Sequence, residues 1–223
     1  MIGELRTVED VPGEFTSIWL NAYEHRASAV FVFAASGGAT AKRCYERLAA
    51  TAATVINWRS VEVVWTDERC VPPDSEHSNE GLAREVLISR IGGVGATYPM
   101  RCETGPDSYD ALLRRLGAID LAHLGLGADG HTASLFPGSP AMRLPPERLV
   151  AASRDPTGIN PFPRMTLTLG ALARSRLAVF TVEGEAKREA LARVMANDPT
   201  APATHVRARR VVWIVDRSAA GAD

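Results

Sequence analysis

Short apolar runs alternate with amphipathic helical patterns along most of the chain. The runs that read as buried strands are residues 29–34, 61–65, 119–126, 149–153, 165–169, 176–182 and 210–215. The predicted helices between them are residues 39–52, 79–91, 107–116 and 185–195. This alternation is typical of a parallel sheet with helices packed on it. We therefore predict an α/β fold with a mainly parallel, Rossmann-like sheet and helices on both faces.

The whole chain, residues 1–223, is predicted to form a single domain, because it holds no repeat, low-complexity tract or linker. About 28 residues precede the first predicted strand. One long irregular region, residues 137–163, is rich in Pro and Gly. Loops of that length inside compact domains tend to be functional, so we expect this region to fold over a ligand site.

The most informative turn follows the third predicted strand and places a carboxylate, Asp129, two residues before an imidazole, His131. Ligands of open α/β sheets bind at the carboxyl ends of strands, so this turn is in a ligand-binding position. The glycines Gly125, Gly127 and Gly130 permit positive φ values or a close approach to a ligand. The alternative is an ordinary connection with a solvated Asp and His.

An anion-binding turn is predicted between the first strand and its helix, where small residues expose backbone N–H groups at a helix N-terminus. Its residues are Ser36, Gly37, Gly38 and Thr40. Glycine can also serve backbone geometry alone there, so this motif is weak by itself. In another turn, Lys187 lies at the start of a helix, where a cation opposes the helix dipole and favours a compensating anion.

Charged residues also follow the second predicted strand, where Asp67, Glu68 and Arg69 precede Ser78 and Asn79 at the start of a helix. At a strand end they allow an internal ion pair and leave at least one charge facing a cleft. A solvated charge cluster is the alternative. Because the strand ends of a parallel sheet open on one edge, we expect all four turns to converge there.

This inventory favours general-base catalysis. The sequence offers no candidate thiolate nucleophile, no GxSxG elbow and no metal-ligand cluster. The imidazole of His131 is therefore the natural base for water or for a substrate proton. A formal net charge of −1 argues against a nucleic-acid or anionic-membrane surface and favours a small-molecule partner.

Three cysteines, Cys44, Cys70 and Cys102, are few and unevenly spaced, so we predict neither a disulfide framework nor a CxxC metal site. A reducing cytoplasm is then the simplest compartment. No stretch approaches the roughly 18 apolar residues of a membrane span, and the N-terminus has no apolar signal region. We expect a soluble, unprocessed protein that is a monomer or a weak homo-oligomer.

Five motifs stand in a fixed order between about residues 29 and 216: Ser36-Gly-Gly-Ala-Thr40, Asp67-Glu-Arg-Cys-Val-Pro72 with Ser78-Asn79, Gly127-Ala-Asp-Gly-His-Thr-Ala-Ser-Leu-Phe-Pro137, Arg164-Met-Thr-Leu-Thr168 and Gly184-Glu-Ala-Lys187. This ordered set resembles the 6-phosphogluconolactonases. The resemblance implies hydrolysis of 6-phospho-D-glucono-1,5-lactone to 6-phosphogluconate in the oxidative pentose phosphate pathway, with no metal or other cofactor. It also implies a fold shared with glucosamine-6-phosphate deaminases, ribose-5-phosphate isomerases and CoA transferases.

The resemblance implies a role for each matching residue. The catalytic residues would be His131, which deprotonates the attacking water, Asp129, which holds its ring, and Arg69 at the sugar-acid end. The phosphate would be bound by Ser36, Gly37, Gly38, Thr40, Arg164 and Lys187. The supporting residues would be Asp67, Asn79 and Gly130. One departure is notable: family members read SGGST followed by Pro, whereas Ala39 and Ala41 stand here, which affects the strength of phosphate binding more than its location.

Two other functions stay open. Amino-sugar-phosphate isomerases and deaminases resemble the glycine turn but carry an acid in an Ile-Ala-Phe-Asn-Glu-Pro run, where this chain has residues 132–137 with no acid. A sugar-phosphate-binding module without catalysis is the second alternative. Among the other histidines, we read His77 as a loop residue and His123 as a hydrogen-bonded core residue. The tryptophans are read as core: Trp19, Trp58, Trp65 and Trp213.

Overall fold

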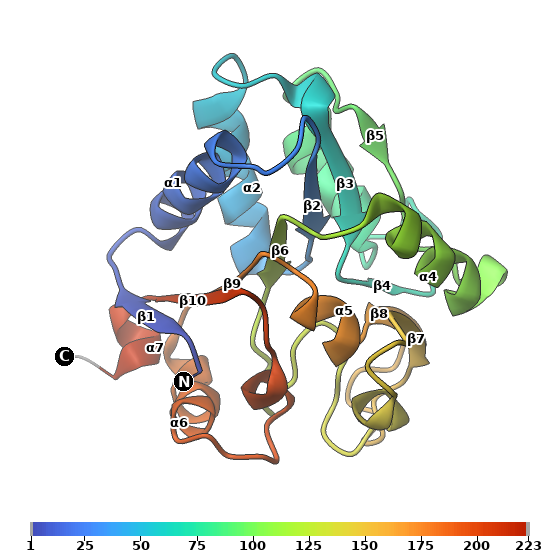
Figure 1. Cartoon of the computed structure of the whole chain (residues 1–223). Coiled ribbons are helices and arrows are strands. Elements are labelled where there is room, and N and C mark those ends of the chain that lie inside the picture. Colours follow the sequence, from blue (N-terminus) through green and yellow to red (C-terminus); the bar gives the residue numbers. More distant parts are fainter. Residues whose placement is uncertain (1, 222–223) are drawn as a thin grey trace.

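The computed structural model describes residues 2–221, and its larger sheet has seven strands (Figure 1). Every neighbouring pair in this sheet is parallel. In spatial order the strands are β1 (Glu4–Thr7), β10 (Arg210–Val215), β9 (Leu177–Val182), β6 (Leu121–Leu124), β2 (Phe31–Ala35), β3 (Val61–Trp65) and β5 (Ala96–Thr97). The predicted α/β fold with a mainly parallel sheet is confirmed.

Helices cover both faces of this sheet, and Figure 1 shows α1 and α2 on one side of β2 and β3 and α4 on the other. The α-helices are α1 (Val11–Glu24), α2 (Ala39–Ala52), α3 (Asn79–Ala83), α4 (Gly105–Leu116), α5 (Leu169–Ala173), α6 (Arg188–Met195) and α7 (Arg217–Ala220). Short helical turns are η1 (Trp58–Ser60), the π-helical η2 (Arg84–Ile88), η3 (Cys102–Thr104), η4 (Pro140–Arg143), η5 (Glu185–Lys187) and η6 (Pro202–His205). Within residues 2–221, no helix has both the length and the apolar character needed to cross a membrane.

A second, antiparallel sheet of three strands lies beside the first in the order β4 (Asp67–Arg69), β8 (Arg164–Leu167) and β7 (Val150–Ser153). The strand predicted over residues 165–169 was expected to meet the parallel sheet, and this is wrong, because it pairs with β4 and β7 in the smaller sheet. Their alternation of Thr with apolar residues indicates a strand but carries no information about its partner. The small sheet matters for the site because it joins the segment after β3 to the chain before α5.

The sequence analysis predicted neither the first strand nor the first helix. Strand β1 is an edge strand whose residues are mostly exposed, so it contains no apolar run. Helix α1 begins at an N-cap, Asp10, whose side chain accepts a hydrogen bond from the backbone N–H of Gly13 at 3.0 Å. Its inward face places Phe15 and Trp19 in the core with no exposed surface. The chain before residue 29 thus contributes both a strand and a core helix.

The core lies between the larger sheet and its helices. All residues of β2 and β9 are buried, as expected for central strands of a parallel sheet. Trp19 packs edge-on against Phe31 and Phe33, and Phe180 stacks on Trp213 with ring centroids 3.7 Å apart. All four tryptophans are buried, which confirms their predicted core role.

The strand order creates a crevice at the carboxyl ends of β2 and β6. From β2 the chain moves outward to β3 and β5, then returns to β6 on the other side of β2 and continues to β9 and β10. The connections that leave β2 and β6 therefore diverge in opposite directions. In open α/β sheets, such a switch point is where ligands bind.

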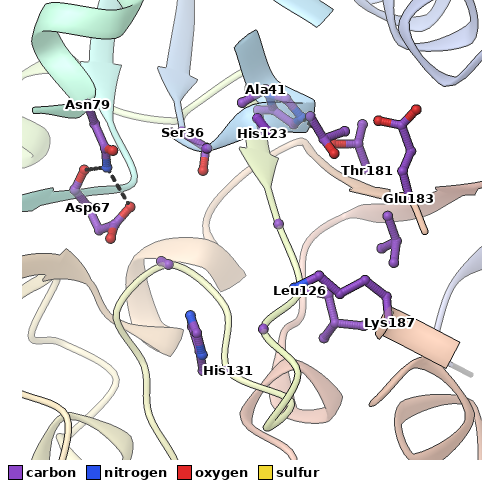
Figure 2. Close-up of a pocket in the computed structure, with 18 of the residues that line it drawn as sticks. Ser36, Ala41, Asp67, Asn79, His123, Leu126, His131, Thr181, Glu183 and Lys187 are labelled. Atoms are coloured by element: carbon purple, nitrogen blue, oxygen red, sulfur yellow. Dashed lines mark hydrogen bonds between the residues drawn. The ribbon is translucent and has the colours of Figure 1, made fainter. Parts of the chain in front are cut away.

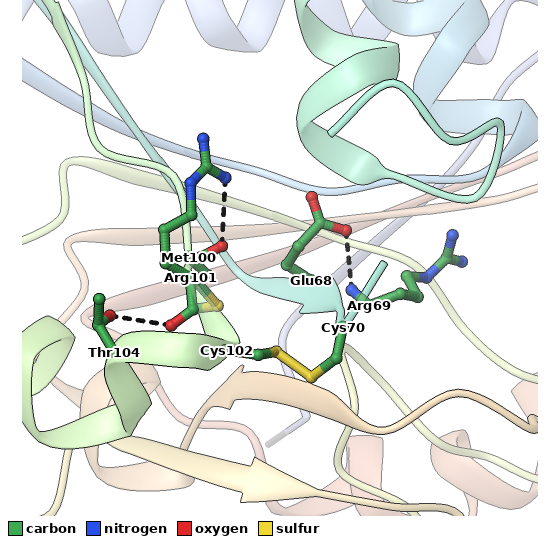
Figure 3. Close-up of a disulfide and its surroundings, with 7 residues drawn as sticks. All are labelled: Glu68, Arg69, Cys70, Met100, Arg101, Cys102 and Thr104. Atoms are coloured by element: carbon green, nitrogen blue, oxygen red, sulfur yellow. Dashed lines mark hydrogen bonds between the residues drawn. A yellow bond between two sulfur atoms is a disulfide. The ribbon is translucent and has the colours of Figure 1, made fainter. Parts of the chain in front are cut away.

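A disulfide joins Cys70, directly after β4, to Cys102 in η3 (Figure 3). The two Cα atoms are 5.5 Å apart, although 32 positions separate the residues in the sequence. The prediction of no disulfide is wrong, because only the tertiary fold brings these two segments together. Cys44 is free and buried, so the odd number of cysteines is compatible with one disulfide. The cysteine count no longer supports a reducing compartment.

Candidate active site

A cavity of about 470 Å³ opens at the switch point (Figure 2). Its volume lies within the range of about 300–1,000 Å³ that small-molecule sites span. The predicted site residues that line it are Ser36, Gly37, Gly38, Thr40, Asp67, Asn79, Arg69, His131, Arg164 and Lys187. Four turns that are far apart in the sequence therefore border one cavity, as the strand-end argument predicts.

The two other predicted residues, Asp129 and Gly130, are not among the lining residues, but Asp129 holds His131. The Nδ1 atom of His131 donates to Oδ1 of Asp129 at 2.6 Å, and the backbone N–H of His131 donates to the same oxygen at 3.0 Å. Burial raises the pKa of Asp129, but the hydrogen bonds and charge of His131 outweigh this, so the pKa is lowered overall. In the neutral ring, Nδ1 carries the proton that Asp129 accepts, so the lone pair is on Nε2, which has no hydrogen-bond partner among residues 2–221.

The geometry of this pair depends on a glycine at position 127. A Cβ atom added to Gly127 would lie 2.1 Å from Nδ1 of His131 and 2.6 Å from Oδ1 of Asp129. The backbone N–H of Gly127 also donates to the carbonyl of His131 at 2.8 Å, which closes the turn. Gly130, which takes a positive φ of 86°, lies in the same turn. The turn thus folds its own backbone against the imidazole and leaves no room for a side chain.

The Ser36–Thr40 turn presents the N-terminus of α2 to the cavity. The N-cap is Gly38, which has no side chain. The first backbone N–H groups of the helix therefore receive no capping hydrogen bond from the N-cap residue. A Cβ atom on Gly37 would lie 1.8 Å from Oδ1 of Asn79, so the turn packs directly on that amide. Lys187, at the end of η5, lines the same cavity and has no ion-pair partner within the described chain. These groups suit an anion.

A buried ion pair stands at another wall of the cavity. Arg164 Nη1 lies 3.6 Å from Oδ2 of Asp67, and both side chains are at most 7% exposed. Ser134 donates its hydroxyl to the same Asp67 oxygen at 2.6 Å, and Asn79 Nδ2 donates to Oδ1 at 3.2 Å. Burial lowers the pKa of Arg164, although Asp67 opposes that effect. Arg164 also faces the ring of Phe136, 5.5 Å from its centroid.

Arg69, the last residue of β4, is the remaining cation of this wall, and a buried carboxylate holds its segment. Glu68 accepts backbone hydrogen bonds from Arg69, Asn79 and Glu80 at 2.7–2.8 Å, together with the hydroxyl of Ser78 at 3.1 Å. Burial raises the pKa of Glu68 despite these donors. Arg69 donates to the carbonyl of His77 at 2.5 Å and lies next to Cys70 (Figure 3). Strand β4, which ends at Arg69, is thus tied to α3 and to the disulfide.

His123 contributes to the floor of the cavity. It is 1% exposed, and its ring nitrogens contact the hydroxyls of Tyr45 at 2.9 Å and Thr181 at 2.8 Å. Burial lowers its pKa to about 3, so the ring is neutral. Its predicted role as a hydrogen-bonded core residue is confirmed. His77, predicted as a loop residue, is exposed and lies between β4 and α3.

Sequence reasoning missed several lining residues, of which Arg43, Glu183 and Asn160 have charged or amide side chains. Arg43 stands one helical turn beyond Thr40, a spacing that could have placed both on one helix face. Glu183 directly follows β9, at the same sheet edge as the other turns. Asn160 comes from the predicted loop region 137–163, which also contains η4 and β7. Within the described chain, no group of three or more His, Cys, Asp or Glu side chains could hold a metal ion.

Comparisons with known proteins agree with this architecture. The profile of the family described as glucosamine-6-phosphate isomerases/6-phosphogluconolactonase matches residues 8–213. The chain is similar to a 6-phosphogluconolactonase of Caulobacter vibrioides, 36% identical over 197 residues that cover 81% of this chain and 82% of that one. A relative with the same name from Synechocystis is 33% identical, and the match covers 83% of this chain and 82% of that one.

Solved structures show the same fold. The crystal structure of a 6-phosphogluconolactonase from Thermotoga maritima has a TM-score of 0.84 at 30% identity, covering 96% of this chain and 99% of that one. A monomeric glucosamine-6-phosphate deaminase has a TM-score of 0.80 at 18% identity, covering 99% of this chain and 100% of that one. At this identity, the match shows only that the two proteins share a fold. The motifs, the sheet order and these matches agree: the chain belongs to the glucosamine-6-phosphate isomerase/6-phosphogluconolactonase family.

Proposed function

We propose that this protein hydrolyses 6-phospho-D-glucono-1,5-lactone to 6-phosphogluconate, the second step of the oxidative pentose phosphate pathway. One observation carries the proposal: a histidine whose Nδ1 is bound by Asp129 shares a single cavity with the free N-terminus of α2 and with Lys187. A base and an anion site in one cavity of this size match a small phosphorylated substrate. The names of the relatives support the same reaction.

In the proposed reaction, Nε2 of His131 takes a proton from water while the water oxygen attacks C1 of the lactone. The tetrahedral intermediate then collapses, the bond between C1 and the ring oxygen breaks, and His131 returns its proton to that oxygen. The products are a free hydroxyl and a carboxylic acid, which ionises in solution. Asp129 keeps the imidazole in the tautomer with its lone pair on Nε2 and stabilises the imidazolium formed in between.

The cations of the cavity would position the substrate at its two ends. The Ser36–Thr40 turn and Lys187 would hold the phosphate through backbone N–H groups and one ammonium, and Arg164 would join them. Arg69 would stabilise the charge that develops on the carbonyl oxygen. Asp67, Asn79 and Gly130 would support these loops. Binding through the remote phosphate fixes C1 relative to the water on His131, which supplies the positioning contribution.

This arrangement is adequate without a covalent nucleophile. A lactone is an activated ester, and one oriented base contributes about 10²- to 10⁴-fold. A donor aimed at the developing oxyanion adds about 10²- to 10³-fold. A water-mediated reaction can therefore reach a useful rate with the groups that line this cavity.

The direct test follows acid release in a pH-stat from the lactone with and without its 6-phosphate. We expect enzyme-dependent release of one acid per lactone and a marked preference for the phosphorylated substrate. Absence of enzyme-dependent release from either lactone would overturn the proposal. Ammonia release from glucosamine 6-phosphate would indicate the deaminase instead, and binding of 6-phosphogluconate without turnover would indicate a sugar-phosphate-binding module.

A further inference from the structure

An ion pair that no predicted role explains borders the anion side of the cavity. Arg43, in α2, donates from Nη2 to Oε2 of Glu183, which directly follows β9. The same Nη2 atom lies 3.4 Å from the hydroxyl oxygen of Thr40, one of the predicted phosphate donors. The side chains are 49% and 18% exposed, respectively. Both residues line the cavity.

The position of Glu183 is unfavourable for a site that binds a phosphate dianion. In Figure 2 its carboxylate points away from Lys187, and no ion pair joins the two within the described residues. Lys187 therefore does not neutralise it. Arg43 does, and without Arg43 the cavity would present an uncompensated carboxylate beside the phosphate turn.

Arg43 also has N–H groups that are not used in these contacts. A guanidinium has five N–H groups in a planar fork, and the contacts to Glu183 and Thr40 come from one nitrogen. In the neighbouring turn, Ala39 offers no hydroxyl to an anion. A guanidinium next to Thr40 can supply charge-assisted hydrogen bonds there.

We infer that Arg43 is a further cationic ligand of the substrate's phosphate, besides Lys187 and Arg164, and that Glu183 is the positioning residue that holds Arg43 beside Thr40. This inference rests on the proposed lactonase function, whose substrate carries that phosphate. Arg43 acts twice: its free N–H groups donate to the phosphate, and its charge cancels that of Glu183. The pair thus adds phosphate donors beside a turn in which residue 39 has no hydroxyl.

The experiment compares kcat/KM for the phosphorylated and unphosphorylated lactone, and the ratio between them measures phosphate recognition. We expect R43L to lower this ratio by about 10- to 100-fold, the effect of losing charge-assisted hydrogen bonds. R43K should retain part of the ratio because it keeps the charge. R43L/E183Q should recover several-fold over R43L, since the unpaired carboxylate is gone.

Arg47→Leu is the matched control, because Arg47 is on the same helix, is 50% exposed and pairs with Asp10 at 3.1 Å outside the cavity. A ratio for R43L equal to that for R47L would overturn the inference and leave the lactonase function standing. Equal ratios for R43L and R43L/E183Q would overturn the claim that Arg43 cancels the charge of Glu183, and a wild-type ratio in E183Q would overturn the positioning role of Glu183. Failure of the wild-type protein to hydrolyse the phosphorylated lactone would instead refute the proposed function itself.

Discussion

Replacing Gly127 by alanine should disable the proposed base without unfolding the protein. Gly127 has no positive φ, so alanine can adopt its backbone conformation. The added Cβ, however, would lie 2.1 Å from Nδ1 and 2.3 Å from Cε1 of His131. Ordinary carbon contacts begin at about 3.4 Å, so the ring must move by roughly 1.3 Å. It cannot retreat while keeping Asp129, whose Oδ1 would lie 2.6 Å from the same Cβ.

The expected effect follows from this displacement. A misplacement of about 1 Å at a reacting group costs on the order of 10²-fold in rate. Loss of the Asp129 hydrogen bond adds a second penalty, because the ring is then free to present the wrong nitrogen to water. We expect kcat for the phosphorylated lactone to fall by about 10²- to 10³-fold, which corresponds to about 3–4 kcal/mol of lost transition-state stabilisation.

Two measurements separate this effect from general damage. The first is kcat in the pH-stat, and the second is the NMR signal of the hydrogen-bonded Nδ1 proton of His131, which should be lost when Asp129 no longer holds the ring. Gly125→Ala is the matched control, since its Cβ would meet no atom within 4 Å, and its thermal stability and Nδ1 proton signal should equal those of the wild type. A G127A variant with wild-type kcat and an unchanged Nδ1 proton signal would refute the reasoning.

Three further predictions concern the base, the buried histidine and the disulfide. His131→Asn should lower kcat by about 10²- to 10⁴-fold while calorimetry still detects 6-phosphogluconate, and wild-type turnover would remove His131 from catalysis. Burial lowers the pKa of His123 to about 3, so the unfolded chain takes up a proton first on acidification. The contribution of neutral His123 to stability is fully present above about pH 6.5. At lower pH, the free energy of unfolding should decrease by up to about 1.4 kcal/mol per pH unit. Urea titrations should show this slope flattened in H123Q, and an unchanged slope would contradict the assignment. Reducing the Cys70–Cys102 bond, which spans 32 positions, should lower unfolding free energy by about 3–4 kcal/mol, and the C70S/C102S variant should no longer respond to reductant.

Periodicity located the buried elements of the main sheet because burial on both faces leaves a continuous apolar run. The predicted helix 39–52 and strands 61–65 and 210–215 have the bounds of α2, β3 and β10. The predicted strand 119–126 is longer than β6, Leu121–Leu124, because apolar residues continue past the paired segment into the glycine turn. Apolar character reports burial, and burial extends beyond hydrogen-bonded pairing.

The location of the candidate site followed from topology, but its internal contacts did not. That the turns after β2, β3, β6 and β9 meet is a property of any parallel sheet and needs no long-range information. The hydrogen bond from Ser134 to Asp67 and the disulfide join residues 67 and 32 positions apart, respectively. Nothing in the local sequence distinguishes such partners from residues that never meet. The same is true of Glu183. The sequence shows an acid after a predicted strand, but only the fold shows that it pairs with Arg43.

The charge inventory of the cavity explains why a phosphorylated lactone, whose product has an anion at each end, would fit it. Four cationic side chains and two carboxylates line the cavity, and each carboxylate is held by a cation from another element, Asp67 by Arg164 and Glu183 by Arg43. Within residues 2–221, Arg69 and Lys187 alone among these cations have no carboxylate partner. They follow different strands, β3 and β9, with β2 and β6 between them. A product that carries a phosphate at one end and a new carboxylate at the other satisfies both cations, whereas an unphosphorylated lactone leaves Lys187 uncompensated.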